Sequence, residues 1–135
     1  MLKVAFTTLC LLLAGCSTAE KEFGPAALLK KYEMFKDMAA ALDAKKADLE
    51  VAEGRLRSLE KRYEGVAAKD WPRHDSERLS VWEQEVVGLK LSYNRLAADY
   101  NAAMAKENYR FCNQGDLPRG ADRPLPREFA TYISK

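Results

Sequence analysis

The chain has 135 residues, of which 31% are charged and 47% hydrophobic, and its formal net charge is +2. This length allows one domain at most. A charge balance this close to neutral gives no electrostatic case for a nucleic-acid partner. The many charged residues beside Ala and Leu are typical of long helices and coiled coils.

The first segment, residues 1–15, has the pattern of a signal peptide. Lys3 provides a positive charge, and the eleven residues from 4 to 14 are apolar or nearly so. That length falls within the ~7–15 residues of a signal-peptide core and is well short of the ~20 residues that span a bilayer as a helix. We therefore expect residues 1–15 to be a signal peptide that directs export.

Leu13-Ala14-Gly15-Cys16, at the end of this segment, resembles the lipobox of bacterial lipoprotein precursors. The resemblance implies that the Cys16 thiol receives a diacylglyceryl group, that the leader is cut off before it, and that the new amino terminus is acylated, for example with palmitate. Such chains anchor a protein durably, since each buried methylene contributes about 0.8 kcal/mol. Ser17 in place of Asp implies the outer membrane, facing the periplasm, in a cell with two membranes. The alternative is an ordinary secretory leader with an incidental cysteine.

Cysteine usage leaves one thiol in the mature chain. Cys10 leaves with the leader and Cys16 carries lipid, so Cys112 has no intrachain partner. A lone thiol in an oxidising compartment is either buried as a small hydrophobic group or forms an intermolecular disulfide. Neither arrangement indicates catalysis.

A flexible tether at residues 16–24 is followed by a predicted helix over residues 25–69. Pro25 suits a first helical turn, where its missing N–H has no helical partner to lose. Apolar residues recur here at intervals of seven, and a second row follows three residues after members of the first. The first row is Leu28, Phe35, Leu42, Leu49, Leu56 and Tyr63, and the second is Met38, Ala52, Leu59 and Val66.

A second helix is predicted over residues 74–109, after a tip at residues 70–75. Pro72 cannot continue the first helix. The second helix has its own heptads: Leu79, Val86, Tyr93 and Tyr100 in one row, and Trp82, Leu89, Leu96 and Ala103 in the other. A short connection makes such helices antiparallel neighbours. The predicted fold class is all-α, a long antiparallel two-helix coiled-coil hairpin with a Pro-rich irregular C-terminal tail.

Folding the chain at residues 70–75 predicts a definite register. Leu49 would face Leu96, and Lys45 would lie over Tyr100. In this register the start of the first helix, including Phe35, extends beyond the second helix and needs another cover.

A second apolar stripe lies on the face of the second helix opposite its seam. It consists of Val87, Leu91, Ala98, Ala102 and Ala105. Two helices alone rarely bury enough surface to be stable. We expect the missing cover to be the tail, a second copy of the chain, or a different protein.

The tail, residues 112–135, is rich in Pro and Arg and predicts extended or turn-like structure. The spacing of Phe129, Tyr132 and Ile133 predicts a last short amphipathic turn. One interpretation is a Pro/Arg recognition segment. We favour the other, in which apolar tail residues pack over the base of the first helix, because exposed they would be a liability. These residues are Leu117, Leu125, Phe129 and Ile133.

The tip offers candidate contact residues. If lipid holds the base, Trp71 and Arg73 are among the most distal groups, and Trp and Arg are favoured anchors at protein contacts. The alternative role for Trp71 is to close the end of the coil against Val66. His74 beside Asp75 would have to carry any metal or acid–base chemistry, and the sequence supplies no second His and no metal-spaced Cys pair. We expect no enzyme, metal, cofactor or small-molecule substrate.

Two further resemblances concern the mature chain. Tyr93-Asn94 and Tyr100-Asn101, with Phe111 after them, resemble the YN repeats of the LemA family, although Cys112 stands where that family has Pro after the Phe. We carry no function over from this match. Lipidated Cys16, a heptad body and terminal Lys135 resemble the murein lipoprotein, which implies covalent attachment of Lys135 to peptidoglycan. That protein is much shorter, forms one helix per chain and has no Pro-rich tail.

These patterns together predict a membrane-anchored envelope lipoprotein that acts as a non-enzymatic scaffold or adaptor through helix–helix contacts. Contact residues would be Trp71, Arg73, Val87 and Leu91. One alternative function is a peptidoglycan tether through Lys135, and another is an enzyme or metal-binding protein that uses His74.

The lipid anchor gives a direct prediction. Replacing Cys16 by Ala removes the only thiol at the lipobox, so the protein should move from the membrane fraction to the soluble fraction. Cys112→Ala, the matched control, should stay with the membranes. Membrane association of Cys16→Ala at the wild-type level would contradict the anchor.

Overall fold

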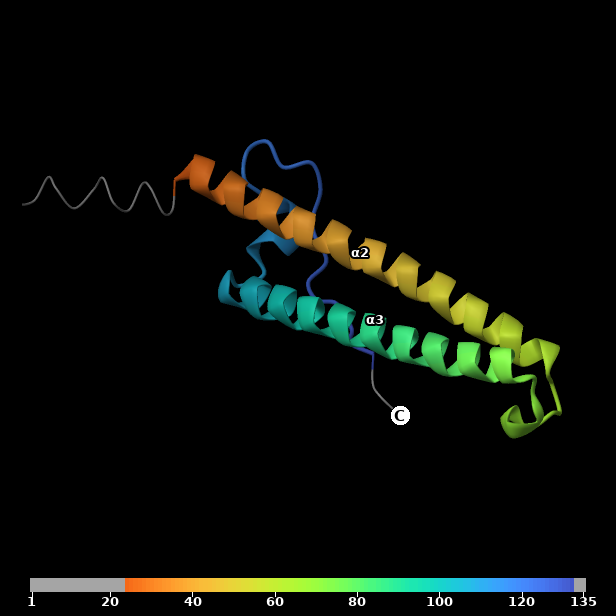
Figure 1. Cartoon of the computed structure of the whole chain (residues 1–135). Coiled ribbons are helices and arrows are strands. Elements are labelled where there is room, and N and C mark those ends of the chain that lie inside the picture. The colour runs from red at the N-terminus through yellow and green to blue at the C-terminus, as the bar shows by residue number, and fades with distance from the viewer. Residues whose placement is uncertain (1–23, 133–135) are drawn as a thin grey trace, which may run out of the picture.

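The computed structural model describes residues 24–132, which form a long helical hairpin (Figure 1). Helix α2 spans Pro25–Arg62 and helix α3 spans Arg73–Lys106. Short 3-10 helices follow each of them: η1 (Ala68–Asp70), η2 (Arg110–Cys112) and η3 (Gln114–Asp116). Residues 24–132 contain no β-strand, so the predicted all-α hairpin is confirmed.

Several predictions concern residues outside this range. The signal peptide, the tether up to residue 23, Cys16, Ile133 and Lys135 all lie outside the described residues. Within residues 24–132, neither long helix contains a stretch that is both long enough and apolar enough to cross a membrane.

Both helices end earlier than the heptad rows predicted. Helix α2 ends at Arg62, not at residue 69, and Gly65 then adopts a φ of +81°, a left-handed conformation that glycine adopts without a steric penalty. Helix α3 ends at Lys106, not at residue 109, because Asn108 and Tyr109 have φ values of +51° and +56°. The spacing of apolar residues does not predict these positive φ values, so it placed both helix ends too late.

The tip of the hairpin is closed by aromatic contacts. The rings of Tyr63 and Trp71 are stacked with centroids 4.5 Å apart, and Trp71 Nε1 donates to the Val66 carbonyl at 2.9 Å. The Tyr63 hydroxyl donates to Asp75 Oδ2 at 2.5 Å. Trp71 therefore closes the coil near Val66, which was the alternative role predicted for it.

The register of the two helices differs from the prediction by about one heptad. Lys45 Nζ donates to Ser92 Oγ at 2.7 Å and does not lie over Tyr100. Phe35, expected to extend beyond the second helix, packs edge to face on Tyr100 with centroids 5.7 Å apart. A shift of seven residues replaces each heptad position by an equivalent one, so the apolar pattern fits both registers. The early end of α2 shortens the first arm of the hairpin and selects the observed register.

The main core lies at the base of the hairpin and is largely aromatic. Its largest fully buried side chains are Tyr32, Phe35, Leu42, Tyr100, Met104 and Phe111. The Phe111 ring lies 5.4 Å from that of Phe35 between centroids, which covers the end of α2 that the prediction left bare. A smaller cluster of Leu49, Ala52 and Val86 continues toward the tip.

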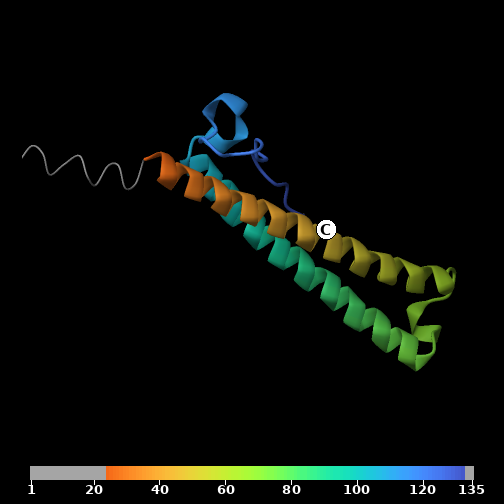
Figure 2. The same cartoon turned by 90° about the horizontal axis from the view of Figure 1, so that it is seen from above.

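The tail packs back along the base half of the hairpin (Figure 2). Leu125 is buried, and Leu117 and Phe129 pack against the same core, as predicted for the tail residues within the described range. The predicted helical turn beginning at Phe129 is wrong, because the chain remains non-helical through Tyr132. Side chains of α3 bind the backbone N–H and carbonyl groups of Phe129 and Tyr132 instead.

Candidate functional site

Two asparagines of α3 bind the backbone of the tail. Asn101 Nδ2 donates to the Phe129 carbonyl at 2.9 Å, and the Phe129 N–H donates to Asn101 Oδ1 at 2.8 Å. Asn94 makes the same pair of hydrogen bonds with Tyr132, at 2.8 and 2.7 Å. Each side-chain amide thus satisfies one donor and one acceptor of an extended chain, which explains why this segment needs no helix.

The tyrosines that precede these asparagines contact the same tail residues. Tyr93 packs edge to face on Tyr132 with centroids 5.0 Å apart, and Tyr100 on Phe129 at 4.9 Å. The Tyr100 hydroxyl donates to the carbonyl of Pro126 at 2.5 Å. We call Tyr93, Asn94, Tyr100 and Asn101 the YN clamp, since each Tyr-Asn pair holds one tail residue by its ring and its backbone.

The spacing of the YN clamp matches that of the tail. Seven residues of an α-helix rise about 10.5 Å. Three residues of an extended chain cover nearly the same distance, about 9–10 Å, and in a polyproline-type helix every third residue lies on the same side. Pro126, Phe129 and Tyr132 are spaced by three and all contact the clamp. The Tyr-Asn pairs, seven residues apart on α3, are therefore as far apart as the tail residues that they bind, which are three residues apart.

The tail is also held on α2 by a charged group. The Tyr32 hydroxyl donates to the Asp122 carboxylate and accepts from the backbone N–H of Arg123 at 3.2 Å. Lys36 Nζ lies 3.1 Å from Asp122 Oδ2. The hydrogen bonds from Tyr32 and Lys36 lower the pKa of Asp122 to about 2, and Asp122 in turn raises the pKa of Lys36. Asp122 is thus an anion at any physiological pH.

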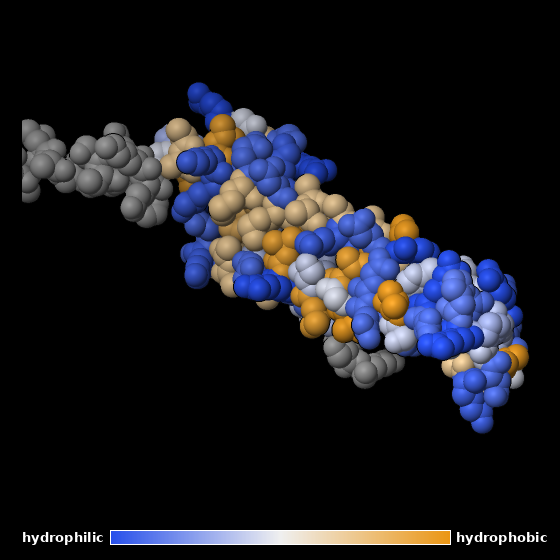
Figure 3. Space-filling view, in the orientation of Figure 1, coloured by the Kyte–Doolittle hydropathy of each residue, from blue (hydrophilic) through white to orange (hydrophobic). Residues whose placement is uncertain are grey.

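The predicted stripe on α3 remains accessible in the described part of the chain. Val87 and Leu91 are 57% and 60% exposed, and the three alanines of the stripe are exposed as well. The tail, up to Tyr132, binds Asn94 and Asn101 and leaves the five residues of the stripe exposed. Figure 3 shows how apolar residues gather over the base half of one face of the molecule, while the tip half is mainly hydrophilic.

The tip residues have local partners. The Arg73 side chain is almost fully exposed and pairs with Glu77 at 2.8 Å. His74 Nδ1 lies 3.2 Å from Asp75 Oδ1, and the hydrogen bond from Tyr63 is the main reason that the pKa of Asp75 is lowered. Within residues 24–132, no three side chains of the metal-binding types come together.

Cys112 is half-buried against the base core, where burial raises the pKa of its thiol. A raised pKa keeps the group in the protonated, less nucleophilic form. Its position fits the small-hydrophobe interpretation better than that of an exposed reactive thiol.

Sequence reasoning singled out the two Tyr-Asn pairs and the tail aromatics separately and did not connect them. The spacing of the residues could have connected them, because seven residues of a helix and three residues of an extended chain cover nearly the same distance. Comparisons with protein-family models, with curated proteins and with solved structures find no match to this chain. The LemA-like pattern thus has a local structural explanation, the binding of the tail.

The YN clamp makes a prediction about stability. Asn101→Ala should lower the free energy of unfolding by about 1–3 kcal/mol, because it leaves the Phe129 N–H and carbonyl without partners in a half-buried place. Chemical denaturation followed by circular dichroism measures the loss. Gln84→Ala, an exposed amide on the same helix, is the matched control and should change stability by less than about 0.5 kcal/mol. Equal effects of the two substitutions would contradict the clamp.

Proposed function

We propose that the chain is a lipid-anchored envelope adaptor, without enzymatic activity, that presents α3 to a helix of another protein. The lipid anchor rests on the lipobox at Cys16. With the anchor at the start of the chain, the base of the hairpin lies nearest the membrane and the tip at Trp71 farthest from it.

One observation carries the proposal: the outer stripe of α3 stays exposed although the tail is already packed. Three covers were conceivable for this stripe, and the tail up to Tyr132 is used elsewhere, against the YN clamp. Of the other covers considered, another protein and a second copy, we propose another protein. An apolar face on an otherwise charged helix is typical of a helix–helix contact.

The shape of the stripe supports a helical partner. Ala98, Ala102 and Ala105 recur at intervals of four and three, so they lie on one face of α3. Their small side chains allow a second helix to approach closely, and Leu91 and Val87 would supply larger groups beside them. The resulting contact would lie along the base half of the hairpin, near the membrane.

Site-specific photo-crosslinking in cells that express the full chain tests this proposal. A crosslinker at Leu91 should capture one defined protein, identified by mass spectrometry. The same crosslinker at Lys46, exposed on α2, should not capture it, because that position lies off the stripe.

Substitution of Leu91 distinguishes binding from proximity. With the crosslinker placed at Ala98, the added change Leu91→Asp should abolish capture while helix content stays at the wild-type value, since Leu91 is exposed. Capture only of a second copy, or equal capture from Leu91 and Lys46, would contradict an adaptor that uses this stripe for a different protein.

A further inference from the structure

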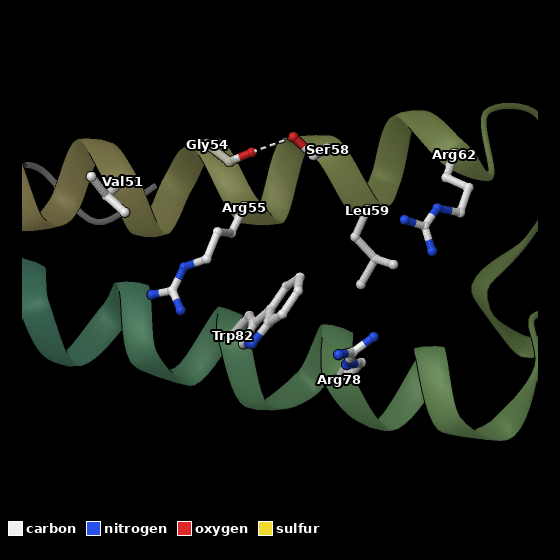
Figure 4. A pocket seen from close by; sticks show the side chains of 8 residues that line it. All are labelled: Val51, Gly54, Arg55, Ser58, Leu59, Arg62, Arg78 and Trp82. Atoms are coloured by element: carbon white, nitrogen blue, oxygen red, sulfur yellow. Dashed lines mark hydrogen bonds between the residues drawn. The ribbon is translucent and has the colours of Figure 1, made fainter.

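A furrow runs between α2 and α3 in the tip half of the hairpin. Its volume is about 400 Å³, within the range of small-molecule sites. Figure 4 shows Arg55, Leu59 and Arg62 reaching from α2 toward Trp82 and Arg78 of α3. A smaller hollow, of about 280 Å³, continues it along the hairpin past Arg55.

The floor of the furrow is apolar. Leu59 is buried, Trp82 is half-buried, and Val51 is 62% exposed at the rim. An apolar ligand body lying on these groups would remove them from water, which is favourable in proportion to the area covered.

The rim is positively charged. Three arginines and no acidic residue line the furrow, in a chain whose 22 basic and 20 acidic residues nearly balance. Arg55 pairs with Glu85 at 2.7 Å, whereas Arg78 lies 3.8 Å from Asp75, which already accepts a hydrogen bond from Tyr63. Arg62 is exposed and also acts electrostatically on Asp75, whose pKa it helps to lower, so Arg62 and Arg78 share this one carboxylate. The furrow therefore has an excess of guanidinium charge.

Trp82 holds two of these guanidinium groups in place. Arg55 and Arg78 lie 5.8 and 5.5 Å from the centre of its ring, at cation–π distance. Their donors are thus kept beside the apolar floor before any ligand arrives, which reduces the entropy lost on binding.

The furrow lies on the flank of the hairpin that the tail does not occupy. Asn94, which binds the tail, comes one residue after the seam residue Tyr93, whereas Arg78 comes one residue before the seam residue Leu79. These positions face opposite sides of a heptad seam. The two flanks of α3 thus carry different surfaces.

We propose that this furrow binds a small organic anion with an apolar body and one carboxylate, sulfonate or phosphate group. The body lies on Trp82 and Leu59, and the anionic group accepts hydrogen bonds from Arg62 and Arg78. Guanidinium groups bind such oxyanions with charge-assisted, often bidentate, hydrogen bonds. The site is independent of the partner stripe and of the lipid anchor.

Fluorescence titration of the full chain with 1-anilinonaphthalene-8-sulfonate, an aromatic sulfonate, tests the proposal. The chain has two tryptophans, so a Trp71→Phe background leaves Trp82 as the sole tryptophan, which is excited selectively at a wavelength where tyrosine does not absorb. We expect saturable binding of one dye per chain with quenching of Trp82, and competition by octanoate but not by inorganic phosphate at the same concentration.

Arginine variants locate the bound anion. Arg62→Gln with Arg78→Gln should weaken dye binding at least tenfold, while Arg57→Gln, an exposed arginine of α2 outside the furrow, should leave it unchanged. Circular dichroism confirms that each variant is folded, and dye emission repeats the comparison in the wild-type background. Equal binding by the two variants, or dye bound without quenching of Trp82, would overturn the site. Displacement by phosphate as effective as by octanoate would overturn the requirement for an apolar body.

Discussion

The paired hydrogen bonds between the YN clamp and the tail backbone are the interaction on which the rest of the structure depends. A hairpin of two helices leaves both flanks of its seam open and buries little surface. The tail covers one flank at the base, where Phe129 and Tyr132 meet Tyr100 and Tyr93. It thereby completes an aromatic core that two helices alone would leave open.

Because the tail covers one flank of the hairpin, two other surfaces of α3 stay exposed. The outer face keeps its exposed apolar stripe around Leu91, which we propose for a protein partner. The other flank, toward the tip, keeps the open furrow around Trp82, which we propose for an organic anion. The base end of the hairpin adjoins the segment that would carry the lipid. Each proposal thus concerns a separate part of one hairpin.

The sequence predicted the two helices, their antiparallel arrangement and the return of the tail, because periodicity and proline report on local structure. It did not predict the register, since a heptad pattern is unchanged by a shift of seven residues, and the turn at Gly65 decides between the two. The YN clamp was not predicted because it matches a seven-residue spacing on a helix with a three-residue spacing in a non-helical segment. Each spacing was considered only within its own segment. The furrow was missed because its arginines come from both helices and converge only in the observed register.

Native-state hydrogen exchange measured by NMR on the full chain tests the central claim most directly. The amides of Phe129 and Tyr132 lie in a non-helical segment, and their acceptors are the side chains of Asn101 and Asn94. We predict protection comparable to that of amides in the middle of α3, because exposure of these groups requires release of the tail from the core. Exchange of both amides at the rate of an unstructured peptide, with α3 still protected, would contradict the account.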